Sequence, residues 1–174
     1  MLDLPVEALG PGQVRVRVTA AAVNPTDTGV RAGLRGTGDR PAGGVDVPGM
    51  DVAGVVVELG ENVSTDLVAG ARVMGIVVPS GPHGGYREDL VLPERSVTRV
   101  PAGASDVAAA SLPMNGLTAR QALDLLGLRP GEVLAVTGAA GAFGGYVIQL
   151  AKVEGLTVIW FVTVSSPSRT PEIV

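Results

Sequence analysis

Residues 132–159 combine short apolar runs with regularly spaced glycines, a pattern that strongly limits how the chain can fold. The run from Val133 to Val136 is typical of a strand buried on both faces of a parallel sheet. Gly138, Gly141 and Gly144 follow it at intervals of three residues. Glycines at this spacing allow a sharp turn, a close approach of a ligand to the backbone and tight packing of a helix on a strand. The pattern therefore predicts a glycine turn between a strand and a helix.

The helix after this turn is expected from about Ala142 to Glu154, with Gly155 ending it. A second β-rich run up to Ile159 completes a βαβ unit. Because a helix N-terminus presents N–H groups and the positive end of a dipole, the unit predicts a dinucleotide site. The cofactor-binding residues would be Gly138, Ala139, Ala140, Gly141, Ala142, Phe143 and Gly144. The alternative is an ordinary βαβ turn that binds nothing.

Composition argues against several classes of function. Seventeen acidic residues against 13 basic ones give a formal charge of −4, and no basic cluster is present, so no nucleic acid partner is expected. The absence of cysteine excludes disulfides and fits a reducing compartment, so a cytoplasmic location is expected. The longest apolar run, Leu156 to Val164, is too short to span a bilayer, and neither membrane insertion nor export is expected.

The region before residue 103 predicts a different architecture, with short β-like segments bounded by glycine or proline. The expected strands are Gln13–Val18, Val52–Leu59, Arg72–Val78, Glu88–Leu92 and Ser96–Val100. Together they predict a small β barrel or sandwich. Helices are expected at Asp106–Ala110 and at Thr118–Leu126, before the βαβ unit.

Motifs that match one family occur in order along the chain: GPGQVRVRV, VNPTD, PGMDVAGVVVELGENV, GARVMGI, GGYRE, NGLTARQAL and VTGAAGAFGG. The chain resembles the medium-chain dehydrogenase/reductase superfamily, and within it the zinc-independent quinone oxidoreductases related to zeta-crystallin. The resemblance implies an α/β plus β fold, with a GroES-like β-barrel domain at residues 1–102. An incomplete Rossmann domain would follow at 103–164, with NADPH in the cleft, and then a divergent tail at 165–174.

The resemblance also implies that no metal is bound. Zinc-dependent relatives hold the ion with a cysteine where this chain has Asn24, and with a histidine and a glutamate where it has Met50 and Asp51. A thioether and one carboxylate would make a poor zinc site. The sole histidine, His83, has no second ligand nearby in sequence and is expected to be an exposed loop residue.

Two polar residues are candidates for contact with the cofactor. In the family, the asparagine of the NPxD stretch lies near nicotinamide and substrate, so Asn24 is the expected catalytic and cofactor-contacting residue. The alternative is that Asn24 only shapes a turn before Pro25. Thr118 matches a cofactor-contacting position, and its hydroxyl would also suit the cap of a helix beginning at Ala119.

The resemblance implies hydride transfer from NADPH to a quinone or an α,β-unsaturated carbonyl compound. No acidic residue follows the second βαβ strand, and Ser165, Ser166 and Arg169 would suit a 2′-phosphate, which favours NADP over NAD. A short-chain dehydrogenase is disfavoured, because the glycine turn begins only at Thr137 and neither tyrosine has a lysine four residues later.

The matched region covers about half of a complete relative, so a truncated chain is expected. A homodimer is possible on this reasoning, although the strand through which relatives dimerise is not matched. The alternative function is a non-catalytic remnant or interaction module built on the GroES-like domain.

Overall fold

The computed structural model describes residues 3–34, 44–63 and 66–162. The chain forms two compact units, residues 1–114 and 115–174, which are described separately. The division falls after Met114, so the residues from 103 to 114 lie with the first unit. None of the described helices is long and apolar enough to cross a membrane.

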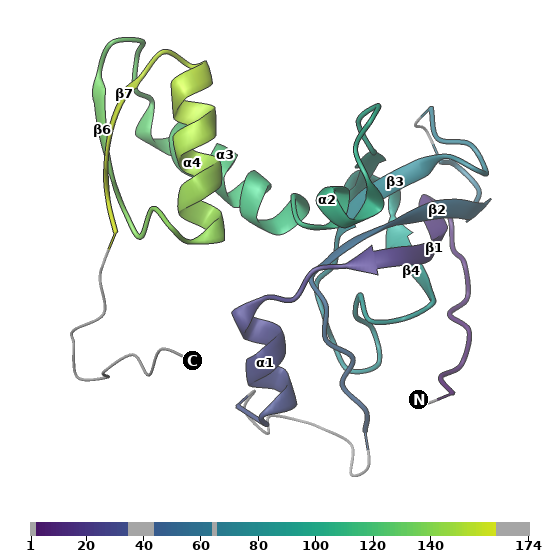
Figure 1. Ribbon diagram of the computed structural model, residues 1–174. Coiled ribbons are helices and arrows are strands. Elements are labelled where there is room, and N and C mark those ends of the chain that lie inside the picture. The colour runs from purple at the N-terminus through teal and green to yellow at the C-terminus, as the bar shows by residue number, and fades with distance from the viewer. Residues whose placement is uncertain (1–2, 35–43, 64–65, 163–174) are drawn as a thin grey trace. The chain divides into compact units, whose positions relative to one another are not determined.

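The first unit contains one five-stranded antiparallel sheet with the strand order β4-β1-β2-β3-β5 (Figure 1). Its strands are β1 (Gln13–Ala21), β2 (Asp51–Leu59), β3 (Arg72–Ile76), β4 (Asp89–Pro93) and β5 (Val97–Arg99). All five were expected from the sequence, with bounds that differ by no more than three residues. The predicted β-rich architecture of this region is confirmed as an antiparallel sheet.

Alternation of apolar and polar residues places the core of the first unit. Val14 and Val16 in β1 are fully buried, whereas Arg17, the next residue along the strand, is exposed. Such alternation buries one face of a strand and leaves the other in water. Helix α2 (Asp106–Ala110), which was also expected, packs Ala109 and Ala110 against Ala53 of β2. The Oγ of Ser105 caps this helix by accepting a hydrogen bond from Ala108 N at 3.2 Å.

Helix α1 (Pro25–Arg31) was not expected as a helix. It begins with proline at its first position, where the missing N–H costs nothing, and Asn24 is its N-cap in an extended conformation. Asp27, at the third helical position, accepts a hydrogen bond from the Asn24 backbone N–H. The Asn24 side chain in turn faces the backbone N–H of Asp27, so the two residues form a capping box. This capping box stabilises the start of a helix of only seven residues.

The second unit contains a parallel pair of strands, β6 (Val133–Thr137) and β7 (Thr157–Phe161), joined by helix α4 (Ala142–Val153). Helix α3 (Pro113–Leu126) enters it from the first unit, so its first two residues are counted there. Figure 1 shows α3 and α4 on the same side of the two strands. Their shared core consists of Ala119, Leu123, Leu134, Val136, Val147, Ala151 and Leu156. The predicted βαβ unit is therefore present.

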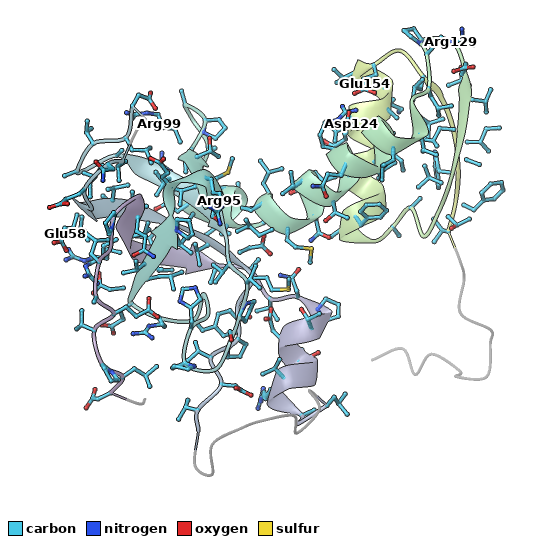
Figure 2. The ribbon with its side chains drawn as sticks, turned by 180° about the vertical axis from the view of Figure 1, so that it is seen from behind. Glu58, Arg95, Arg99, Asp124, Arg129 and Glu154 are labelled. Carbon is cyan, nitrogen blue, oxygen red and sulfur yellow. The ribbon has the colours of Figure 1, made fainter. Side chains whose placement is uncertain are left out.

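An ion-pair cluster links the two helices of this unit. Arg120 Nη2 of α3 lies 2.7 Å from Oδ1 of Asp124, one turn further along the same helix. The Arg120 guanidinium also forms an ion pair with Glu154 at the C-cap of α4. Figure 2 shows Asp124 and Glu154 beside each other at this end of the helices. The arginine therefore joins α3 to the end of α4 at the margin of the apolar core.

The expectation that the first βαβ strand is buried on both faces is wrong for the part of the chain that the structure describes. Leu134 and Val136 are buried under the helices, but Val133 is 56% exposed. The reason is that both helices cover one face of the β6–β7 pair. We call the opposite face the open face; its residues are Val133, Ala135, Thr137, Thr157, Ile159 and Phe161, and all six are exposed.

Candidate functional site

Asn24, the expected catalytic residue, is held between two elements of the first unit. It is only 5% exposed, and its Nδ2 donates a hydrogen bond to Asp51 Oδ2 at 2.7 Å. It also forms the N-cap of α1, so the turn that was the alternative role is present. The structure thus gives Asn24 a structural role, and its contact with a cofactor stays a prediction.

Asp27 accepts hydrogen bonds from two backbone N–H groups, one at the start of α1 and one in the loop before β2. Its Oδ2 accepts the backbone N–H of Asn24 and its Oδ1 accepts the backbone N–H of Gly49, each at 2.8 Å. The carboxylate is 4% exposed. Asp27 therefore ties α1 to the loop before β2 through backbone amides.

Tyr86 closes the other side of the Asp27 carboxylate. Its hydroxyl lies 3.1 Å from the Ala22 carbonyl oxygen and 3.3 Å from Asp27 Oδ2, and its proton can be donated to one of them at a time. Burial, with the negative charge of Asp27, raises the pKa of Tyr86 to about 12. The hydroxyl therefore stays protonated and acts as a hydrogen-bond donor to the protein.

Asp51 is fully buried at the start of β2 and accepts two hydrogen bonds from N–H donors. Asn24 Nδ2 donates to its Oδ2, and the backbone N–H of Met114, the second residue of α3, donates to its Oδ1. Burial raises the pKa of Asp51, while these two hydrogen bonds oppose the rise. The neighbouring Met50 accepts a hydrogen bond at its Sδ from Thr26 Oγ1 at 3.2 Å.

Two of the three positions at which zinc-dependent relatives were expected to carry ligands, Asn24 and Asp51, are joined by a direct hydrogen bond in this chain. The ligand atoms of a tetrahedral zinc site stand about 3.3 Å apart, given zinc bonds of about 2.0 Å. Asn24 Nδ2 and Asp51 Oδ2 are closer, at 2.7 Å, and are joined by a proton on the nitrogen. Among the described residues, no group of three histidine, cysteine, aspartate or glutamate side chains is arranged to hold a metal ion.

Two surface hollows of the first unit meet at Tyr86. The larger, about 830 Å³, runs along β1 beside the N-terminal segment. The smaller, about 530 Å³, lies over α1 and is lined by Asp27, Thr28, Arg31, Pro48 and Tyr86 among others. Its mixed apolar and polar lining and its size are within the range of small-molecule pockets.

His83 differs from the exposed loop residue that was expected. Its Nδ1 lies 3.0 Å from Glu7 Oε1, and the ring is half-buried. Glu7 also accepts hydrogen bonds from the Arg87 guanidinium and from the backbone N–H of Val91. The histidine thus helps to hold the N-terminal segment against the sheet.

The glycine turn in the second unit has two of the three expected features. Gly138 has a φ of +68°, which makes the sharp turn after β6. A Cβ at Gly144 would stand 2.6 Å from the Gly138 carbonyl oxygen, so the helix packs tightly on the turn only with glycine there. Gly141 is the N-cap of α4, and its N–H donates to Gly138 O at 2.9 Å. The first N–H groups of an α-helix have no acceptor within the helix, so this end suits an anion.

The remaining expected residues fall outside this turn. Thr118 is exposed within α3, which begins at Pro113, so the expectation that its hydroxyl caps a helix starting at Ala119 is wrong. Asn24 belongs to the first unit, and Thr118 and the glycine turn belong to the second. Ser165, Ser166 and Arg169 lie outside the described residues.

Sequence reasoning gave Asp51 only a negative role, as a poor replacement for a zinc ligand. Nothing in the local sequence predicts that Asp51 contacts Asn24, because the two are 27 residues apart. A signal for α1 was present in Asn24, Pro25 and Asp27, which together form a helix start.

Comparison with known proteins places this geometry in a family. The model of the alcohol dehydrogenase GroES-like domain matches residues 10–102. A 2-haloacrylate reductase from Burkholderia sp. is 34% identical over 97% of the chain, which covers 50% of that protein. A 2-methylene-furan-3-one reductase from Solanum lycopersicum is 39% identical over 80% of the chain, which covers 37% of that protein.

Solved structures show the same relationship. The quinone oxidoreductase from Thermus thermophilus, solved also as a complex with NADPH, has a TM-score of 0.74 and 34% sequence identity, and the match covers 94% of this chain and 49% of that one. The chain thus spans about half the length, or less, of the relatives it matches. With the GroES-like family model matched over more than half of its residues, the chain belongs to the medium-chain dehydrogenase/reductase superfamily.

Proposed function

We propose that this chain functions as an NADPH-dependent oxidoreductase of the zinc-independent medium-chain type, which reduces quinones or α,β-unsaturated carbonyl compounds. The observation that carries the proposal is the glycine turn from Gly138 to Gly144 at the N-terminus of α4, in a chain similar to a quinone oxidoreductase solved with NADPH. The direct hydrogen bond between Asn24 and Asp51 supports a reaction without zinc.

The residues of the glycine turn fit a dinucleotide pyrophosphate. Gly138 turns the chain away from β6, Gly141 caps α4 without a side chain, and Gly144 lets the helix lie close to the turn. Backbone N–H groups of Ala142 and Phe143, in the first turn of α4, would hold the phosphates. When bound, NADPH would supply the hydride.

The names of the relatives indicate a substrate class. Haloacrylate, methylene-furanone and quinone each contain a carbon–carbon double bond conjugated to a carbonyl or carboxyl group. Adding hydride to such a system places negative charge on the carbonyl oxygen, and a fixed N–H donor lowers the energy of that charge. In this proposal Asn24 Nδ2, which carries a second N–H besides the one donated to Asp51, is the polar group that touches cofactor or substrate.

The test is a fluorescence titration of the folded chain with NADPH, followed by turnover of 1,4-benzoquinone and of 2-chloroacrylate. Gly144→Ala should weaken NADPH binding by at least tenfold, because its Cβ would displace the turn. Gly145→Ala is the matched control, since nothing lies within 4 Å of a Cβ there. Folded wild-type chain that shows neither NADPH binding nor turnover of either compound would disprove the proposal.

A second candidate is a non-catalytic interaction module, and the open face favours it. Ile159 and Phe161 are 49% and 55% exposed on that face, beside Val133. An apolar sheet face of this kind is a common site of association with another protein surface. A monodisperse monomer that binds NADPH and turns over a quinone would contradict this second candidate.

A further inference from the structure

Two buried carboxylates hold Asn24 at its two ends. Asp27 accepts the Asn24 backbone N–H at 2.8 Å, and Asp51 accepts the side-chain N–H at 2.7 Å. Both carboxylates and Asn24 are at most 5% exposed. The proposed function uses only Asn24 of these three residues, so the buried charge of Asp51 needs a separate explanation.

The position of Asp51 is set by backbone contacts on three sides. It pairs with Ile76 across the β2–β3 ladder, and its carbonyl oxygen accepts the N–H of Ala22 at 3.3 Å. Its Oδ1 accepts the N–H of Met114, which lies in the first turn of α3 and has no acceptor within that helix. These contacts hold the carboxylate in place independently of Asn24.

A carboxylate held in this way determines which end of the asparagine amide faces it. An ionised carboxylate has only acceptor atoms, and an amide has donors on Nδ2 and acceptors on Oδ1. Asp51 therefore selects the orientation with Nδ2 toward it and Oδ1 away, and the flipped orientation would oppose two oxygens. Hydrogen bonds to a charged acceptor are also stronger than those between neutral groups.

We propose that Asp51 is a positioning residue that fixes the orientation of the Asn24 amide, through a carboxylate anchored at the N-terminus of α3. The proposal rests on the proposed function for its effect on catalysis, whereas the orientation itself is a property of the folded chain. Asp51 does not touch substrate or cofactor in this scheme.

Side-chain amide spectra test the orientation without any activity. The chain has only three asparagines and three glutamines, so a ¹H–¹⁵N spectrum holds six NH₂ pairs, and Asn24→Ser identifies the pair of Asn24. In the wild type, one Nδ2 proton of Asn24 should resonate downfield of the NH₂ protons of the other five pairs. It should also exchange with water at least tenfold more slowly than those protons.

Variants at position 51 complete this test. Asp51→Asn should abolish the downfield shift, because the new amide cannot accept from both Asn24 and Met114. Asp51→Glu keeps the carboxylate and should retain part of the shift. Asp66→Asn is the control, since Asp66 is exposed and pairs with Arg99 elsewhere on the first unit. An Asn24 pair unchanged by Asp51→Asn overturns the proposal. If Asp51→Asn does not fold, the wild type decides: Asn24 Nδ2 protons that exchange with water as fast as the protons of the other NH₂ pairs overturn the proposal.

A double-mutant cycle tests the effect on the reaction. Asn24→Ser and Asp51→Asn should each lower kcat about tenfold, and the double variant should be no slower than the slower single one, because Asp51 acts through Asn24. The NADPH dissociation constant of Asp51→Asn should change no more than that of Asn24→Ser, because Asp51 does not touch the cofactor. Unchanged kcat in folded Asp51→Asn, or multiplied losses in the double variant, overturns the proposal. A wild-type chain without turnover disproves the proposed function, and the amide spectra then still decide the role of Asp51.

Discussion

The ring of Tyr86 lies directly against the backbone of Gly49, where a Cβ would stand 2.7 Å from Tyr86 Cδ1. The two loops are also joined by hydrogen bonds, from Tyr86 N to Pro48 O at 3.0 Å and from Gly85 N to Gly49 O at 2.9 Å. Gly49 has a φ of +105°, in the region that side chains rarely adopt. Position 49 therefore requires glycine for two independent reasons.

The first prediction compares this glycine with one that needs only its backbone conformation. Gly49→Ala should lower the free energy of unfolding by about 3 kcal/mol, because strain and overpacking combine. Gly70→Ala, at a φ of +87° with nothing within 4 Å of the new Cβ, should lower it by about 1 kcal/mol. Urea denaturation of both variants measures the difference. Equal losses would show that the Tyr86 ring does not press on position 49.

The second prediction concerns the pH dependence of Tyr86, whose pKa of about 12 lies above the ordinary value of 10.0. Below pH 10 the phenol is neutral in both folded and unfolded chains, so the hydrogen-bonded hydroxyl contributes its full stabilisation. Between pH 10 and 12 the unfolded chain ionises first, and stability falls. Tyrosinate absorbance at 295 nm, wild type minus Tyr86→Phe, should show a midpoint near 12. A midpoint near 10 would contradict the burial of the hydroxyl beside Asp27.

The β-rich first unit was predictable because its signals are local. Alternating residues such as Val14, Arg15 and Val16 mark a strand by themselves, and glycine and proline mark its ends. The glycine turn was predictable for the same reason, since Gly138 and Gly144 act on atoms within six residues of each other.

The features that were missed depend on distant parts of the chain. Asp51 meets Asn24 across 27 residues and Met114 across 63, and no local pattern contains that information. The exposure of Val133 was missed for a related reason. An apolar run predicts a buried strand, but the number of faces covered depends on which helices pack beside it.

The third prediction uses two adjacent glycines of α4 that differ in their surroundings. Gly144→Ala should destabilise the second unit by about 2 kcal/mol, because its Cβ would lie 2.6 Å from Gly138 O and 2.9 Å from Ala139 Cα. Gly145→Ala meets nothing within 4 Å and should stabilise the helix by up to about 1 kcal/mol, since alanine is the better helix former. Thermal unfolding followed by circular dichroism measures both changes. Shifts of the same sign would contradict the close packing at Gly144.

The fourth prediction concerns the open face of the β6–β7 pair. Replacing Ile159 and Phe161 together by threonine should reduce both the fluorescence of bound anilinonaphthalene sulfonate and any concentration-dependent sedimentation, because the variant removes exposed apolar surface. The free energy of unfolding should change by less than about 0.5 kcal/mol, as is usual for exposed positions.

Leu134→Ala is the matched control on the covered face of the same pair. Leu134 is buried under the helices, so this variant should lower the free energy of unfolding by about 3 kcal/mol and leave dye binding by the folded chain unchanged. A double threonine variant as unstable as Leu134→Ala would show that the open face is covered in solution, whereas a stable variant with less dye binding shows that apolar surface stands free to receive another protein surface.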